Sequence, residues 1–339
     1  MKIIDFKVIP FSIPFVKPLQ TSAMTYTHRE GVWVQIKSAN FMGVGEASPL
    51  PGFSQEKLKE VHYALEGFHQ AIDGQDLDNE ELFLLIEIHS QNTPSVRFAL
   101  ETAIYDILAK EGERPLAKYL NTNANTEIPV NGLVGLHLSA DGFKVMKLKV
   151  GFRNLFDEIE NMEYLTESFG KNIQFRLDCN GVFDLPKAIR FCKEMEKFNI
   201  DYIEQPLPAN NLEDLAELIY HTEIPIAVDE SLTDYKSAKN IIEEQAADVF
   251  VIKPMVSGGF TECKKIIDLA RTENIRTVIT SSLETNIGRL ACLHLALANN
   301  ITEPCGLATG ELLKEDKITQ PLQDGMIAIP NSHGLGTYL

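Results

Sequence analysis

Cysteine is scarce in this sequence and follows no recognisable pattern. The 339 residues include five cysteines, at positions 179, 192, 263, 292 and 305, and no two of them form a Cys-x-x-Cys pair. This spacing argues against a disulfide framework and against a structural zinc site. The start of the chain also lacks the small-residue cleavage site of a signal peptide. Reduced cysteines without such a signal are typical of cytoplasmic proteins, and we expect that location here.

Long apolar runs and excess positive charge are lacking as well. No run approaches the roughly 20 residues that a membrane-spanning helix needs. Basic residues number 31 against 48 acidic ones, a formal net charge of −17. A field of this sign repels nucleic-acid phosphates and anionic lipid surfaces, so we expect neither as a partner. A dinucleotide-binding loop is missing too, because Gly43 and Gly45 lead into a proline-bearing loop.

A short β-rich run followed by a helical segment recurs through most of the chain. The runs fall at 127–134, 144–150, 173–179, 200–204, 224–229, 248–253 and 275–282, with a weaker one near 304–308. Strands that alternate with helices in this way predict an α/β fold, here a modified (β/α)8 TIM barrel. We place this barrel domain, which carries the active site, at 121–315.

The first 120 residues predict a separate α+β capping domain. Residues 2–11 and 31–38 cluster apolar side chains as strands do, and a polar segment separates them. Residues 95–110 carry apolar side chains at three- and four-residue spacing, which indicates an amphipathic helix. We expect residues 316–339 to return to this capping domain.

Charged side chains stand at the C-terminal ends of five successive predicted strands. They are Lys149, Asp178, Glu204, Asp229 and Lys253. In a barrel these ends meet at one mouth, where active sites are built. Three neighbouring carboxylates repel one another unless a cation lies among them, and oxygen ligands suit Mg²⁺. We therefore predict one Mg²⁺ bound by Asp178, Glu204 and Asp229, with the two lysines on opposite sides.

These motifs resemble those of a known family. The runs KLKVG, RLDCNG, IEQPLP, AVDES, VIKPMVSGG and ITSSLETNIG are similar to the enolase superfamily, in its muconate-cycloisomerase subgroup, over essentially the whole chain. The resemblance implies that the three carboxylates bind Mg²⁺ and that Lys149 and Lys253 face the reacting carbon. A divalent metal on a substrate carboxylate stabilises the enolate formed when the α-proton is removed.

Two regions distinguish members of the subgroup. Residues 305–310 lack the acidic pair that dipeptide epimerases carry there, and Ser281-Ser282 stand where mandelate-racemase relatives have a histidine base. VIKPMVSGGF, TVITSSLETNIG and RLDCN are similar to o-succinylbenzoate synthases. The resemblance thus implies a lyase of menaquinone biosynthesis. It would dehydrate 2-succinyl-6-hydroxy-2,4-cyclohexadiene-1-carboxylate to o-succinylbenzoate through an enolate.

We also expect further residues to bind a small carboxylate substrate or to support the site. The predicted substrate-binding or supporting residues are Lys147, Arg176, Asn180, Ser281, Ser282 and Glu284. Lys147 could instead pair with a nearby carboxylate, and Glu284 could cap a helix. The segment Thr21–Arg29 is expected to form a loop that closes over the site.

Several alternatives stay open from the sequence alone. Two opposed lysines also suit an N-acylamino acid racemase or a dipeptide epimerase, because each could move a proton on one face of the substrate. A catalytically silent, metal-binding barrel belongs to a different functional class. The sequence leaves homo-oligomerisation open.

Overall fold

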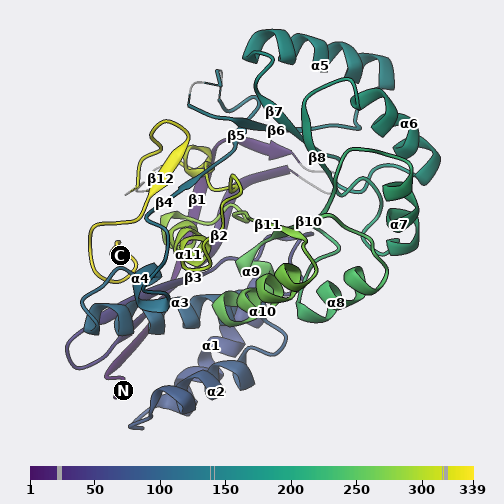
Figure 1. Ribbon diagram of the computed structural model, residues 1–339. Helices are drawn as coiled ribbons and strands as arrows, with labels where there is room; N and C mark the ends of the chain where they lie inside the picture. The colour runs from purple at the N-terminus through teal and green to yellow at the C-terminus, as the bar shows by residue number, and fades with distance from the viewer. Residues whose placement is uncertain (21–24, 138, 141, 315, 317–319) are drawn as a thin grey trace.

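The chain forms an antiparallel N-terminal sheet with its helices and a curled parallel sheet with helices around it (Figure 1). The computed structural model describes residues 1–20, 25–137, 139–140, 142–314, 316 and 320–339. Among these residues, no helix is both long and apolar enough to cross a membrane. The predicted α/β class, a modified barrel with a capping domain, is confirmed.

The N-terminal sheet and its helices, which we call the cap, span residues 5–111. The sheet has the order β1 (Asp5–Gln20), β2 (Thr25–Lys37) and β3 (Met42–Ala47). The helices are α1 (Leu58–Ile72), α2 (Asn79–His89) and α3 (Pro94–Glu111). Strand β3 packs closely on α3, since a Cβ at Gly43 or Gly45 would overlap backbone oxygens of that helix. The two glycines therefore serve close packing, and the predicted helix at 95–110 is confirmed.

The predicted loop between the first two strands is largely wrong. Strand β2 begins at Thr25, inside the polar stretch, and its register with β1 pairs His28 with Pro14 and Tyr26 with Leu19. Residues 25–29 of the expected closing loop therefore belong to β2, and residues 21–24 lie outside the described part of the chain. Most polar side chains at 25–30 mark exposed positions of β2, because a strand needs only one buried face, but Arg29 is buried.

The parallel sheet carries its strands in chain order around a curve. They are β5 (Gly132–Leu133), β6 (Val145–Lys149), β7 (Gln174–Asp178), β8 (Ile200–Glu204), β9 (Ile226–Val228), β10 (Val249–Ile252) and β11 (Arg276–Ile279). The predicted eighth strand is reduced to two bridging residues. Cys305 pairs with Val130 and Gly306 with Thr280, so the two ends of the sheet are joined.

Helices cover the outside of the parallel sheet, as Figure 1 shows. The helices after the cap are α4 (Leu116–Leu120), α5 (Leu155–Phe169), α6 (Leu185–Met195), α7 (Leu212–Tyr220), α8 (Tyr235–Glu243), α9 (Pro254–Ser257), α10 (Gly259–Thr272) and α11 (Asn286–Ala298), followed by a 3-10 turn at Gly310–Leu312. Met146 and Leu148 alternate with the lysines of β6 and join the core under these helices. The opposite face of each strand therefore points into the barrel interior.

The last part of the chain returns to earlier elements. Strand β12 (Met326–Ala328) pairs antiparallel with β4 (Glu127–Pro129). Further on, the backbone N–H of Leu335 donates to Asp106 of α3, and the Leu335 carbonyl lies 3.1 Å from His294 Nε2 of α11. One residue thus joins a cap helix to a barrel helix.

Candidate active site

Three buried carboxylates lie at or just beyond the C-terminal ends of adjacent strands. Asp178 ends β7 and its backbone pairs with that of Glu204, which ends β8. Asp229 follows β9, the next strand of the sheet. Their side chains are 8%, 0% and 3% exposed, respectively. Strand alternation therefore brings these acids to one end of the barrel, as the sequence predicted.

Lysines from two flanking strands approach these carboxylates. Lys147 Nζ of β6 lies 3.1 Å from Asp178 Oδ2 and 2.7 Å from Glu204 Oε1. Lys253 Nζ, just after β10, lies 2.5 Å from Asp229 Oδ2. Lys149 ends β6 directly beside Asp178 in the strand register, and its side chain is exposed. The predicted lysines and acids thus form one cluster, in which Lys147 pairs with the carboxylates.

The pKa values of the clustered carboxyl groups shift in different directions. Burial raises the pKa of Glu204 to about 8; Lys147 opposes the rise, and the charge of Asp178 adds to it. For Asp178, burial acts upward, but Lys147, Lys149 and Lys253 together lower its pKa. The same two acids raise the pKa of Lys147 well above its usual value, although burial alone would lower it. At Glu204, the effect of burial therefore outweighs the stabilising charge of Lys147.

The donor set fits a hard divalent cation in its chemistry. Glu204 Oε2 is buried and has no hydrogen-bond partner, so it is an acceptor that the described protein leaves unsatisfied. The carboxylates offer only oxygen ligands, which Mg²⁺ prefers. Their side chains now turn toward lysines, and no three acidic, histidine or cysteine groups of the described residues gather around a common point. Binding one ion to all three requires these side chains to turn from the lysines.

Two residues that the sequence did not single out touch this cluster. The ring of Phe53, in a cap loop, has its centroid 3.8 Å from Lys253 Nζ, so the cap reaches this predicted catalytic lysine. Glu230 accepts a hydrogen bond of 3.0 Å from Asn180 Nδ2, and burial together with Asp229 raises its pKa to about 7. Glu230 could have been suspected only because it follows Asp229 in the sequence. Phe53 lies in a distant loop, and no sequence pattern links it to this cluster.

The predicted serines and Glu284 lie on the loop that follows β11. Ser281 Oγ is 2.8 Å from Thr309 Oγ1, and the backbone N–H of Ser282 donates to Glu284 Oε2 at 2.7 Å. Ser282 Oγ and Glu284 Oε1 are buried without a hydrogen-bond partner. Burial and the charge of Glu46 raise the pKa of Glu284 to about 7. This loop therefore carries a hydroxyl and a carboxyl group that could serve a ligand.

Arg176 is placed away from the carboxylate cluster, contrary to its predicted role in substrate binding. Its guanidinium is fully buried, 2.7 Å from Asp201 Oδ2, and it also donates to the Pro304 carbonyl and to Asn131. Arg276 lies 2.7 Å from the other oxygen of Asp201. These partners stand at the beginnings of strands, at the end opposite the mouth. Arg176 thus lies in the barrel floor and is not among the candidate substrate contacts.

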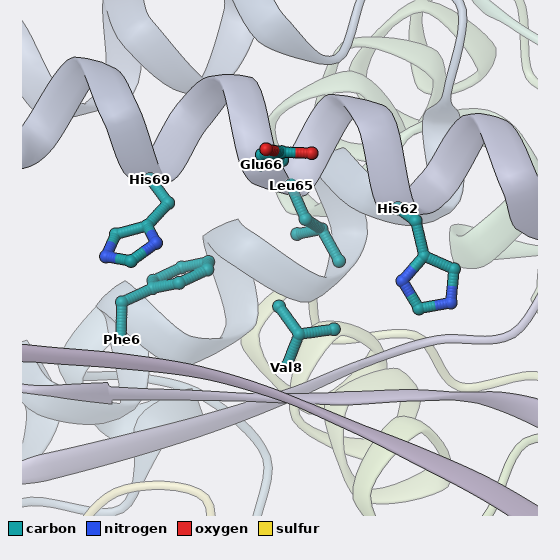
Figure 2. Close-up of a pocket in the computed structure, with 6 residues that line it drawn as sticks. All are labelled: Phe6, Val8, His62, Leu65, Glu66 and His69. Atoms are coloured by element: carbon teal, nitrogen blue, oxygen red, sulfur yellow. The ribbon is translucent and has the colours of Figure 1, made fainter.

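Two cavities lie outside this cluster. One of about 320 Å³ lies between β1 and α1 and is lined by Phe6, Val8, His62, Leu65, Glu66 and His69. Figure 2 shows its two imidazoles at opposite ends, with the apolar side chains between them, so they do not converge on a ligand. Another of about 490 Å³ is lined by residues of α3, α4, α10 and α11. Neither includes a predicted site residue.

Two family models together match most of the chain. Residues 135–339 match the model described as Enolase C-terminal domain-like, and residues 4–107 match MenC, N-terminal domain. Among curated proteins, an L-amino acid-D/L-Glu epimerase of Francisella philomiragia is 30% identical over 89% of this chain and 88% of its own. An N-succinylamino acid racemase of Thermus thermophilus is 28% identical (96% and 92%). An o-succinylbenzoate synthase of Desulfotalea psychrophila is 26% identical (92% and 95%).

Solved structures agree with this relationship. The substrate-liganded L-Ala-D/L-Glu epimerase of Bacillus subtilis superposes with a TM-score of 0.90, 25% identity and coverage of 99% of this chain and 98% of that one. A dipeptide epimerase of Cytophaga hutchinsonii, complexed with Mg and D-Ala-L-Val, gives a TM-score of 0.88, 26% identity and coverage of 99% and 95%. The chain therefore belongs to the enolase superfamily of enzymes, as its strand-end motifs predicted.

Proposed function

We propose that this enzyme is a Mg²⁺-dependent o-succinylbenzoate synthase. The observation that carries the proposal is the region after the eighth strand position, residues 305–310, which contains no carboxylate. A dipeptide carries an ammonium group that needs a carboxylate partner, whereas the cyclohexadiene substrate has no ammonium group. Thr309 in this region bonds instead to Ser281. The match of residues 4–107 to MenC, N-terminal domain, also supports the proposal.

Asp178, Glu204 and Asp229 are the residues that would hold the Mg²⁺. When bound, the ion supplies positive charge to the substrate carboxylate and so stabilises the electrons released by deprotonation. Solved relatives were crystallised with Mg, which supports this choice of ion. Lys147, paired with two of the carboxylates, is a supporting residue of this arrangement.

The two lysines would act on the substrate from β6 and from the end of β10. Lys149 Nζ takes the α-proton, and the substrate carboxylate first holds the electrons of the C–H bond as an enolate. These electrons then form a ring double bond as the C–O bond of the hydroxyl group breaks. Lys149 then returns the proton to the departing hydroxide, so the net loss is one water and the ring becomes aromatic. Lys253 stabilises the developing negative charge by its own positive charge.

Loss of the diene absorbance tests the proposal. Purified, Mg²⁺-loaded enzyme should remove the ultraviolet absorbance of the cyclohexadiene, and Lys149→Ala should lose the activity almost entirely. Lys171→Ala, which alters an exposed lysine before β7, is the matched control and should keep it. The proposal is wrong if the wild-type enzyme leaves the diene untouched while racemising an N-acylamino acid or dipeptide.

An N-acylamino acid racemase or dipeptide epimerase is the second candidate. It is favoured by the 30% and 28% identities to an epimerase and a racemase. Two lysines on opposite faces also suit a reaction in which one removes the proton and the other returns it. Exchange of the α-hydrogen with deuterated water, followed for both enantiomers of an N-succinylamino acid, distinguishes this reaction from dehydration.

The domain boundaries at 120 and 315 stay a prediction. The contacts of Leu335 and of β12 with earlier elements support a C-terminal segment that returns over the fold.

A silent barrel is disfavoured by the presence of Lys149 and Lys253 beside the three acids. Binding a metal alone gives no evident reason for two further lysines.

A further inference from the structure

A glutamate of the cap is built into the start of a barrel helix. Glu46, on β3, is fully buried. Its Oε1 accepts hydrogen bonds from Ser48 Oγ at 2.7 Å and from the Thr285 N–H at 3.0 Å. Its Oε2 accepts from Thr285 Oγ1 at 2.6 Å and from the Gly288 N–H at 3.0 Å. Both carboxylate oxygens are therefore used, and three of the four donors belong to the barrel.

Glu46 caps the N-terminus of α11, a role that usually belongs to the N-cap side chain of the helix itself. Thr285 is the N-cap residue of α11, and its own side chain makes no capping hydrogen bond to that helix. The free N–H groups at a helix start favour a carboxylate. The fit leaves no room for a side chain at Gly288, where a Cβ would lie 2.5 Å from Glu284 Cβ and 3.1 Å from Glu46 Oε2.

An arginine of the same cap holds the loop before this helix. Arg29, on β2, is 1% exposed. Its Nε donates to the Leu283 carbonyl at 3.0 Å, and its Nη2 donates to the Ser282 carbonyl at 3.3 Å. The same guanidinium donates to the carbonyls of Ser48 and Pro49 in the cap. One side chain thus fastens the loop at 281–285 to the cap.

The loop adopts a conformation that needs such support. Leu283 has a φ of 64°, in the left-handed region that is unfavourable for a branched side chain. Its side chain packs against an apolar cluster of Phe15, Tyr26, Leu50 and Leu313, and Phe53 packs at the edge of the same cluster. Phe53 in turn lies against Lys253. Leu283 of the loop and Phe53 beside Lys253 therefore pack against the same apolar cluster.

We propose that Arg29 and Glu46 are positioning residues that set the conformation of loop 281–285 and thereby determine which carboxylate substrates the mouth accepts. The inference rests on the proposed site. The loop carries Ser282 Oγ and Glu284 Oε1, both buried and without a partner in the described structure. Because the cap fixes the loop backbone, it also fixes where this hydroxyl and this carboxyl group can meet a substrate.

Glu46→Gln in the Mg²⁺-loaded enzyme tests the inference. The amide group accepts at one end only, so the two donors at the other end lose their carboxylate oxygen. Amide hydrogen exchange at Thr285 or Gly288 should therefore accelerate about tenfold. The ratio of kcat/KM values for two acids that the wild type converts should change severalfold. Mg²⁺ affinity, measured calorimetrically, should stay constant because Glu46 contacts none of the three acids.

A matched control separates this role from general destabilisation. Glu56 is also a buried glutamate at a helix start, where its Oε1 accepts from the Ser95 N–H at 2.9 Å, but it lies wholly within the cap. Glu56→Gln should leave the substrate ratio unchanged. Arg29→Lys, which keeps the charge but reaches fewer carbonyls, should shift the ratio as Glu46→Gln does, and it serves if Glu46→Gln fails to fold.

Two results would overturn the inference. One is unchanged amide exchange at Thr285 and Gly288; the other is faster exchange there with equal losses of kcat/KM for both acids. The comparison uses two acids that the wild type converts, either the diene with a close analogue of it or a pair of N-succinylamino acids. Failure of the proposed synthase activity would appear in the wild type, whereas failure of the positioning role appears only in the variants.

Discussion

Replacing Arg176 by methionine should destabilise the protein without weakening substrate binding. The substitution keeps much of the side-chain length but removes a fully buried charge that pairs with Asp201 at 2.7 Å. Removing one partner of a buried ion pair costs about 3–5 kcal/mol, because the other charge stays buried. Asp201 keeps Arg276 as a partner at 2.7 Å, so we expect a loss near the lower end, about 3 kcal/mol.

Urea unfolding of Arg176→Met, together with steady-state kinetics, measures both parts of this prediction. The unfolding midpoint should fall, and the KM for the carboxylate substrate should stay within about twofold of wild type. Lys264→Met is the matched control, because the Lys264–Asp268 pair is 62% and 48% exposed and should be worth less than about 1 kcal/mol. A raised KM with unchanged stability would refute the placement of Arg176 in the barrel floor.

Three further predictions concern the metal, the second lysine and pH. Asp229→Asn should lose activity and measurable Mg²⁺ binding while keeping the far-ultraviolet circular dichroism of the fold. Lys253→Ala should lose turnover but still bind Mg²⁺ in calorimetry; retained turnover would contradict its role. Burial lowers the pKa of His294 from 6.5 to about 4, so the unfolded state binds the proton first. The unfolding free energy should therefore fall by up to roughly 3 kcal/mol as pH drops from about 6.5 to 4, and His294→Asn should lose that slope in urea titrations.

Residues on short parallel strands were the most predictable part of the site. Side chains alternate along a strand, so Met146 and Leu148 on one face assign Lys147 and Lys149 to the other. The carboxyl ends of neighbouring strands then share a mouth, which brings Asp178 close to Glu204 without knowledge of the loops. The alternative reading of Lys147 as a partner of nearby carboxylates is confirmed by its two ion pairs.

Alternation gives the face of a strand but not the direction of a long side chain along the barrel axis. Arg176 shares its face of β7 with Asp178, yet its guanidinium extends to Asp201 near the start of β8. The register between β7 and β8 shifts at Phe175 and Arg176. Arg29 was misread for a different reason. A polar stretch suggested a loop, whereas its charge is buried by backbone carbonyls from distant segments. Such partners leave no local signal in a sequence.

The contacts of Leu335 impose an order on folding. Until this residue is present, Asp106 in the cap lacks one of its backbone donors, and His294 lacks the carbonyl beside its Nε2. Both side chains are fully buried in the finished protein, where an unmet hydrogen bond is costly. During synthesis, helix α3 leaves the ribosome long before Leu335 does. The cap therefore reaches its final stability only after the chain has been made through this position, and a nascent chain shorter than that should expose α3 to proteases.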